Sequence, residues 1–228
     1  MEVTKVLLIF ALLFALVSCS NTPEFETGEI QTLQLIKEAL IQTSNKKVNI
    51  DSRNLLSRSQ IDEVAIPIIF VELETGQNGT LTLYPGQAPE KVWLGADGAT
   101  ITTNQGILKA SRGMGDDLMG SVSEMPTWSM IKNKEINYNK LLSYLSGNNK
   151  IYSLKLECKI KKIDSKKSIE VWGAFFVVEE YQELCTSDKI EIKNSYYLDK
   201  HNTVRRSNQY HSETLGYVTT ERLDRWPD

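Results

Sequence analysis

The chain has 228 residues, 26 basic and 29 acidic side chains, a net charge of −3 and 41% hydrophobic residues. This hydrophobic share is typical of globular proteins, and it excludes long disordered regions, collagen-like repeats and multi-span membrane proteins. The near-balanced charge argues against a dedicated nucleic-acid-binding protein, which needs a basic face for phosphates, and two histidines are too few for a His-rich metal site.

The first residues are typical of a lipoprotein signal peptide. Val6–Val17 is an uninterrupted apolar run, too short to cross a bilayer, which takes about 20 such residues, but suited to the apolar core of a signal peptide. It ends in Leu16-Val17-Ser18-Cys19, the lipobox pattern of bacterial lipoproteins, in which the cysteine thiol carries a diacylglycerol. We expect residues 1–18 to be removed and Cys19 to be the lipid attachment site. An ordinary secretory signal with a chance cysteine is the alternative.

The residues after Cys19 indicate the destination membrane and a short linker. Ser20 stands where an aspartate would retain a lipoprotein in the inner membrane of enteric-type bacteria, so we expect outer-membrane anchoring with the domain in the periplasm. Several acyl chains hold firmly, since each buried CH₂ contributes about 0.8 kcal/mol. Residues 19–28 form the lipidated cysteine and a polar linker, whose part after Cys19 spans at most about 30 Å.

Residues 29–228 are expected to form a single domain that begins with helices. Apolar residues recur at spacings of three and four, which predicts a helix with Thr27 as its N-cap; they are Ile30, Leu33, Ile36, Leu40 and Ile41. Ser57 and Gln60 form a capping-box pattern that predicts a short helical turn, and Pro67 ends it.

The next part predicts an antiparallel meander of short strands joined by tight turns. The predicted strands are Ile68–Leu73, Thr80–Tyr84, Val92–Leu94, Ala99–Thr103 and Ile107–Ala110. Ser111–Gly120 is predicted to be a loop.

The remainder predicts one more helix and further strands. Asn137–Leu145 carries leucines and a tyrosine on one face, which predicts a helix. Apolar and polar residues alternate strongly in Leu154–Ile160, which predicts a strand, and Asp164–Lys167 predicts a turn. Ile169–Val178 predicts the returning strand. Its second half is apolar on both faces and therefore needs a cover on each side. The amphipathic helix is one candidate for that cover. Later strands are predicted at Ile190–Leu198, Val204–Tyr210 and Leu215–Leu223.

This pattern of about ten strands and two or three helices predicts a mainly β fold. No repeat and no alternation of strands with helices is visible in the sequence. We therefore expect one antiparallel β-barrel-like or strongly curled sheet domain, because closure removes exposed sheet edges.

Catalytic and metal chemistry find little support in the sequence. Asp116 and Asp117 lie among glycines, but the spacing matches no phosphate-binding loop, and a glycosidase needs two carboxylates across a cleft. His201 and His211 are predicted in or beside turns, without a neighbouring nucleophile. We expect no catalytic residue, no metal site and no cofactor.

Some side chains are candidates for glycan contact. Trp93 and Trp172 lie in apolar strands and are expected in the core, whereas Trp128 and Trp226 lie among polar residues and are candidates for stacking on sugar rings. Arg205, Ser207 and Gln209 project from one side of a strand and could line a saccharide groove; a plain solvated face is the favoured alternative.

A second candidate surface is a lysine cluster around one hairpin. A solvated face is again favoured over attraction of anionic lipopolysaccharide or capsule. The cluster comprises Lys155, Lys159, Lys161, Lys162, Lys166 and Lys167.

A series of short blocks follows the lipobox along the chain, in this order: Lys37–Leu40, Leu56–Asp62, Trp93–Gly98, Thr102-Thr103, Gly106–Leu108, Gly113, Asp117-Leu118, Tyr196–Asp199 and Arg206–Gln209. Together with the lipobox, these blocks resemble the YjbF/GfcB (YmcC-like) family of lipoproteins from exopolysaccharide and group 4 capsule operons. Ile107 is a departure, since the family often has arginine there.

The resemblance implies a β-barrel-like periplasmic domain with a non-catalytic role in surface polysaccharide assembly or export. It also implies operon-encoded partners, a periplasmic and an outer-membrane protein. A module that binds an envelope glycan or lipid without such partners is the first alternative, and a polysaccharide-acting enzyme is the second.

The pairing of Cys158 with Cys185 is left open by the sequence. An oxidising compartment favours a disulfide. If the hairpin turns near Ser165, however, Cys158 lies opposite about Ala174, eleven residues before Cys185. A bond requires the two Cα atoms to lie within about 7 Å.

Overall fold

The computed structural model describes residues 52–64, 66–86, 89–131, 134–145 and 150–225. The chain divides into two compact units, Met1–Ile36 and Lys37–Asp228, and the structure below is that of the second. The predicted signal peptide, Cys19, the linker, the first predicted helix and Trp226 lie outside the described residues.

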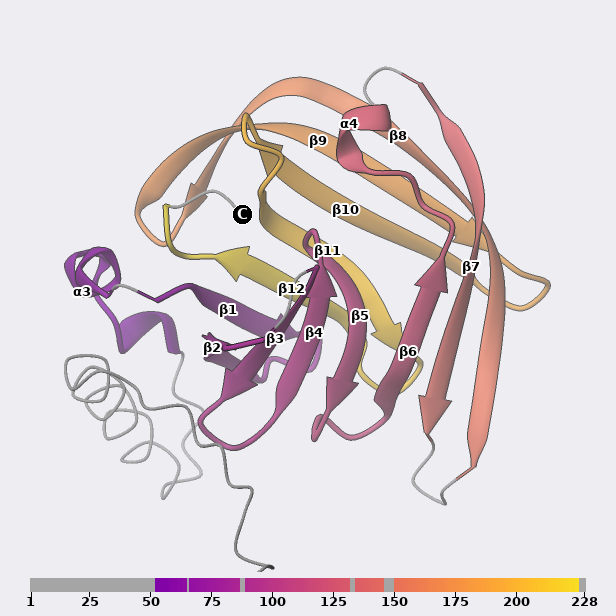
Figure 1. Ribbon diagram of the computed structural model, residues 1–228, viewed down its shortest axis with the longest axis horizontal. Helices are drawn as coiled ribbons and strands as arrows, with labels where there is room; N and C mark the ends of the chain where they lie inside the picture. Colours follow the sequence, from indigo (N-terminus) through magenta and orange to yellow (C-terminus); the bar gives the residue numbers. More distant parts are fainter. Residues whose placement is uncertain (1–51, 65, 87–88, 132–133, 146–149, 226–228) are drawn as a thin grey trace, which may run out of the picture. The chain divides into compact units, whose positions relative to one another are not determined.

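Twelve strands form one antiparallel sheet in the order β5-β4-β3-β2-β1-β12-β11-β10-β9-β8-β7-β6, which curls into a nearly closed barrel (Figure 1). The predicted fold class is confirmed. The strands are β1 (Ile68–Leu73), β2 (Asn78–Tyr84), β3 (Glu90–Gly95), β4 (Thr100–Asn104), β5 (Ile107–Arg112), β6 (Asp117–Ser123), β7 (Ile136–Leu145), β8 (Ile151–Val171), β9 (Ala174–Thr186), β10 (Glu191–Asp199), β11 (Val204–Ser212) and β12 (Gly216–Arg222).

Three short helical segments accompany the sheet within the described residues: η2 (Ser52–Asn54), α3 (Arg58–Glu63) and α4 (Trp128–Ile131). The predicted capping box of α3 is confirmed, because the Ser57 side chain accepts from the Gln60 backbone and the Gln60 side chain accepts from the Ser57 backbone. No helix in the described part of the chain is long and apolar enough to cross a membrane.

Side chains close the seam between the two terminal strands, β5 and β6. No ladder pairs these strands. Arg112 Nη1 donates to the Leu118 carbonyl at 3.0 Å, and Lys109 Nζ donates to the Ser121 carbonyl at 3.4 Å. In return, Ser111 Oγ accepts from the Leu118 amide at 3.0 Å.

Two apolar cores stabilise the fold. The larger core fills the barrel and includes the inward side chains of β1, such as Ile69 and Val71. The smaller core lies on the other face of β1, where Phe70 packs with Ile61 of α3 and with Ile169 and other residues near the tip of the β8–β9 hairpin. Strand β1 is therefore buried on both faces.

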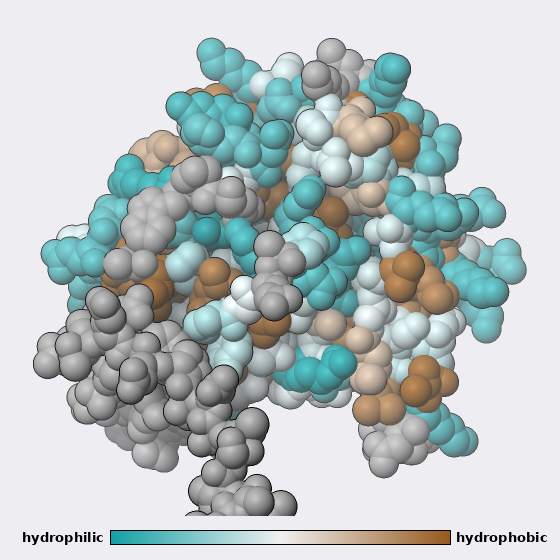
Figure 2. Space-filling view, in the orientation of Figure 1, coloured by the Kyte–Doolittle hydropathy of each residue, from teal (hydrophilic) through white to brown (hydrophobic). Residues whose placement is uncertain are grey.

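The face of the molecule drawn in Figure 2 is mostly hydrophilic. On the face shown in Figure 2, brown apolar residues occur in small groups separated by teal and white residues. Scattered apolar groups of this kind are ordinary on protein surfaces and do not by themselves mark an interface.

The helix predicted at Asn137–Leu145 is wrong, because this segment is strand β7. Its buried residues follow the period of two that a strand requires: Tyr138, Lys140, Leu142 and Tyr144. Lys140 is a charged residue in the buried row, and it hid that alternation. The predicted loop at Ser111–Gly120 is also partly wrong, since β5 runs to Arg112 and β6 begins at Asp117.

The turn predicted at Asp164–Lys167 is wrong as well. Strand β8 continues through two β-bulges in this region and turns at Trp172-Gly173, where both residues have positive φ (50° and 76°), as a tight hairpin turn requires. Cys158 is consequently paired in register with Cys185, and the two form a disulfide.

The later turn also changes which surfaces of the hairpin are covered. Phe175 and Val177 are 74% and 59% exposed, so within the described residues only one face of this hairpin tip is covered, where a cover on both faces was expected. Trp172 lies in the turn instead of a strand and is half-buried against Phe70.

Candidate functional site

The barrel interior holds a buried charged cluster centred on Glu183 of β9. The Glu183 side chain is fully buried and accepts hydrogen bonds from four residues on neighbouring strands. Tyr138 and Lys140 donate from β7, and Asn194 and Tyr196 donate from β10.

This cluster is a fixed ion pair and not a proton-transfer site. Burial tends to raise the pKa of Glu183, but the Lys140 ammonium and the donated hydrogen bonds outweigh burial and lower that pKa. Burial also raises the pKa values of Tyr138 and Tyr196 well above their ordinary value. At neutral pH a carboxylate therefore faces an ammonium and neutral phenols.

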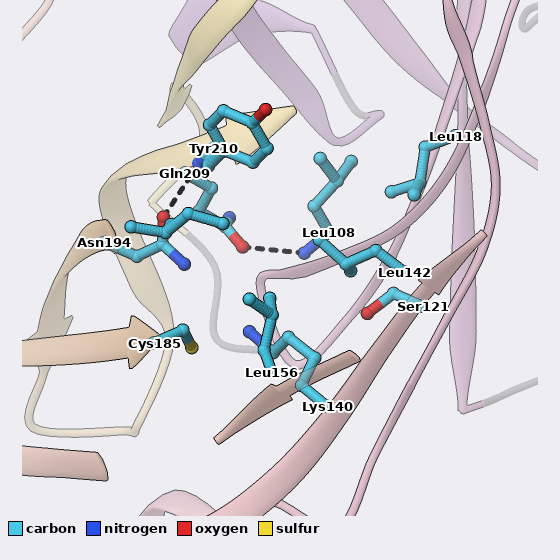
Figure 3. Close-up of a pocket in the computed structure, with 11 residues that line it drawn as sticks. Leu108, Leu118, Ser121, Lys140, Leu142, Leu156, Cys185, Asn194, Gln209 and Tyr210 are labelled. Atoms are coloured by element: carbon cyan, nitrogen blue, oxygen red, sulfur yellow. Dashed lines mark hydrogen bonds between the residues drawn. The ribbon is translucent and has the colours of Figure 1, made fainter. Parts of the chain in front are cut away.

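The space beside this cluster is too small for a ligand. Side chains from several strands converge on this space (Figure 3). Its volume is about 10 Å³, roughly the room that one water molecule needs. Asn194 Oδ1 accepts from the Tyr210 amide at 2.7 Å, and Gln209 Oε1 accepts from the Leu108 amide at 2.8 Å. The interior is thus a packed core, and a saccharide would have to bind outside it.

The proposed polar stripe on β11 does not form an open saccharide groove. Ser207 and Gln209 are 0% and 3% exposed. Gln209 Nε2 donates to the Gly106 carbonyl at 2.9 Å, so together with its bond from Leu108 it braces the start of β5 from inside the barrel.

Arg205 does not share the environment of that stripe. A β-bulge leaves Arg205 as the extra residue of β11, because Arg206 pairs with Tyr197 while Val204 pairs with Leu198. Arg205 is 1% exposed and donates from Nε to Asp199 Oδ2 at 2.7 Å, and its guanidinium lies over the Phe176 ring. A bulge interrupts the period of two on which the prediction rested.

Trp128 is not available as a stacking surface. Its side chain is 3% exposed and packs against the rings of Tyr181 and Tyr196, and its indole N–H donates to the Gln105 carbonyl at 2.9 Å. Trp93 is a core residue, as predicted.

A serine and a histidine that the sequence did not bring together meet near one mouth of the barrel. Ser111 Oγ lies 2.7 Å from His211 Nε2. His211 is the second-last residue of strand β11, beside the turn at residues 213–215, as predicted. The loop between β5 and β6 places Asp116 near them, where its carboxylate accepts from Tyr152 at 3.1 Å and from Thr214 at 3.4 Å. Long-range pairing created this contact, and no local motif indicated it.

This arrangement lacks the parts of a nucleophilic triad. Among the described residues no group bonds His211 Nδ1, where a triad needs its carboxylate, and Ser111 is 1% exposed. Burial lowers the pKa of His211. Burial and the Asp116 carboxylate raise the pKa of Tyr152 to about 12, so its phenol remains a donor that holds the loop.

A metal site is not available in the core either. Cys158, Glu183 and Cys185 place one ligand atom each within 4.8 Å of one another. The two sulfurs are joined in the disulfide, so they lack the thiolates that a metal would bind.

The remaining candidate site is an open groove on the outside of the barrel, which we call the basic groove. It has a volume of about 420 Å³, within the range of small-molecule sites. Its lining residues are Lys134, Glu135, Lys161, Lys162, Ile163 and Ser165. The lysine cluster seen in the sequence contributes two of its members to this groove.

The family model described as "Group 4 capsule polysaccharide lipoprotein gfcB, YjbF" matches residues 32–223. No curated protein matches the chain. The crystal structure of the hypothetical lipoprotein YmcC from Escherichia coli K12 has a TM-score of 0.69 and 16% identity, covering 91% of this chain and 100% of that chain. A putative exported protein with a YmcC-like fold from Bacteroides fragilis has a TM-score of 0.31 and 11% identity, covering 69% and 93%.

Proposed function

Because the chain belongs to the YjbF/GfcB family of group 4 capsule polysaccharide lipoproteins, we propose that it assists assembly or export of a surface polysaccharide without catalysing a reaction. The match over residues 32–223 is the observation that carries this proposal. The protein acts as a lipid-anchored accessory on the periplasmic side of the outer membrane.

The interior of the domain supports a non-catalytic role. Its polar groups are engaged with one another, as the four donors to Glu183 show, and its cavity admits about one water molecule. Ser111 and His211 are buried and lack a triad's carboxylate contact. The outer surface therefore carries the function, through contacts with polysaccharide and with periplasmic and outer-membrane proteins of the same operon.

The lipobox supports the anchor. Cys19 follows Leu16-Val17-Ser18, and the acyl chains on its thiol and amino group would hold the domain at the bilayer. With Cys19→Ala we expect loss of palmitate labelling and a soluble or uncleaved, mislocalised protein. Label retained on that variant would contradict lipidation at Cys19.

Deletion of the gene followed by complementation tests the function itself. We expect deletion to abolish surface polysaccharide and the wild-type gene to restore it. Asp116→Asn combined with Asp117→Asn should restore it too, because the proposal assigns no reaction to these carboxylates. Loss of polysaccharide in this double variant, with the protein folded and anchored, would contradict the non-catalytic role. Unchanged polysaccharide after deletion would refute the accessory role.

A further inference from the structure

The basic groove forms where strand β8 loses one of its neighbours. The β7–β8 ladder ends at the pair Ile136 and Ile160, so from Lys161 onward the β7 side of β8 faces no paired strand. The chain before β7 runs through Glu135 and Lys134 from α4, which lies beside β8 (Figure 1). The groove occupies the space between these two segments.

Two β-bulges shape the wall that β8 provides. Lys162 pairs with Tyr181, Asp164 with Glu180 and Lys167 with Val178, so β8 carries extra residues at two points. Bulges bend a strand and re-aim its side chains. Here they leave Ile163 48% exposed and Ser165 exposed at the groove.

The charges of the groove leave a positive surplus. The Lys134 ammonium pairs with no carboxylate of the described residues, and Lys161 lies at 4.0 Å from Glu135, the outer limit of an ion pair, with half of its side chain exposed. Lys162 is neutralised by Glu179 at 2.9 Å. Three ammonium groups and two carboxylates thus leave the groove one net positive charge, and Lys134 and the half-exposed Lys161 are the ammonium groups that an anion can reach.

We propose that the basic groove binds a carboxylate-bearing sugar residue of a polysaccharide chain. Lys134 and Lys161 contact the carboxylate from the two walls, since lysine ammonium groups pair with oxyanions as mobile point charges. Ser165 offers a hydroxyl for hydrogen bonds with sugar hydroxyls, and Ile163 offers an apolar surface for the CH groups of the ring. This inference rests on the proposed function and names the class of glycan that the accessory recognises.

Calorimetric titration of the full-length lipoprotein in detergent with tetragalacturonic acid tests the groove. We expect binding that weakens as the ionic strength rises from about 0.05 to 0.5 M, because salt screens exposed charges. The methyl-esterified tetramer, which is neutral, should bind at least tenfold more weakly. Lys134→Gln combined with Lys161→Gln should weaken binding of the acid at least tenfold.

A matched control separates the groove from the overall charge. Lys155→Gln combined with Lys193→Gln removes the same charge from exposed strand positions outside the groove, and it should change affinity less than twofold. Both double variants should unfold in urea like the wild type, which excludes misfolding as the cause.

The proposal would be overturned by equal weakening in both double variants, by equal binding of the esterified tetramer, by equal binding of inorganic phosphate, or by no binding of the acidic tetramer. Glucose 6-phosphate distinguishes a phosphorylated headgroup from a sugar carboxylate, and its tighter binding would likewise refute a carboxylate site. If these binding tests fail but deletion of the gene still abolishes surface polysaccharide, the groove proposal alone is refuted. Unchanged polysaccharide on deletion would refute the accessory function itself.

Discussion

Removal of the Lys140 ammonium should destabilise the domain strongly, because it leaves the Glu183 carboxylate without its counter-charge inside the barrel. Both side chains are buried, at 6% and 0% exposure. Loss of one partner of a buried ion pair costs about 3–5 kcal/mol. Three neutral donors, Tyr138, Asn194 and Tyr196, remain on the carboxylate, so we expect about 3 kcal/mol for Lys140→Met.

Glu183 should make the two proteins depend on pH in opposite directions and in different pH ranges, the wild type below pH 4.5 and the variant above it. In the wild type the pKa of Glu183 lies below its ordinary value of 4.5, so this group stabilises the fold above pH 4.5 and its contribution disappears as the pH falls through the lowered pKa. In Lys140→Met the ammonium no longer outweighs the effect of burial on Glu183. The pKa of Glu183 in the folded state should therefore rise above 4.5. The variant should therefore regain stability as the pH falls from 8 to 5.

Urea unfolding of the full-length protein in detergent, at pH 5 and pH 8, measures both effects. Lys140→Met combined with Glu183→Gln should be more stable than Lys140→Met alone at pH 8, because it removes the buried charge. Lys155→Met, at an exposed position of β8, should change the free energy of unfolding by no more than about 0.5 kcal/mol. A loss below about 1 kcal/mol in Lys140→Met, or no gain from the second substitution, would refute the reasoning.

Three further predictions concern other buried contacts. Loss of the disulfide by Cys158→Ser with Cys185→Ser should lower the free energy of unfolding by about 3–4 kcal/mol for a loop of this length, and titration of the denatured, unreduced wild type should find neither of these thiols free. Gln209→Leu should cost about 1–3 kcal/mol in urea unfolding because the Leu108 amide and Gly106 carbonyl lose their partner; an unchanged midpoint would contradict the brace. Gly106→Ala should lower the melting temperature, since φ is +79° and a Cβ there would lie 2.4 Å from that of Val204; an unchanged melting temperature would contradict this packing.

Local signals in the sequence predicted the local parts of the fold. The capping box at Ser57 and Gln60 depends on four consecutive residues, and the structure has it. The meander of Ile68–Leu73 and the following strands depends on alternation and on tight turns, and the structure has those strands with ends shifted by a few residues. In both cases the interactions that decide the structure lie close together in the chain.

The errors arose where a distant partner decided the local structure. Lys140 can be buried in β7 because its ammonium pairs with the carboxylate of Glu183. Glu183 lies 43 residues further along the chain, so no local pattern reveals this pair. Asp164–Lys167 has the composition of a turn, but β9 pairs with β8 through this region and accommodates it as two bulges. Arg205 likewise leaves the inward row at a bulge that the alternation of β11 does not reveal.

The basic groove also combines a feature that is visible in the sequence with one that depends on distant strand pairing. The lysine cluster is visible in the sequence. A solvated face is the favoured interpretation there, because the sequence does not show which segment faces the lysines. Lys134 is not part of that cluster, and it reaches the groove only because the β7–β8 ladder ends at Ile136 and Ile160. The groove is thus a product of strand pairing, which alternation alone does not reveal.

Charge has opposite consequences on the two sides of this sheet. Inside, Lys140 is paired with Glu183 and shielded from water, so its charge is committed to the fold and its loss is a loss of stability. Outside, Lys134 and Lys161 are solvated and contribute little to stability, because exposed ion pairs contribute about 0–1 kcal/mol. Substitution in the groove should therefore change binding and leave unfolding unchanged, while substitution of Lys140 should change unfolding first. A groove variant that lost stability as Lys140→Met does would show that these lysines also belong to the framework of the fold.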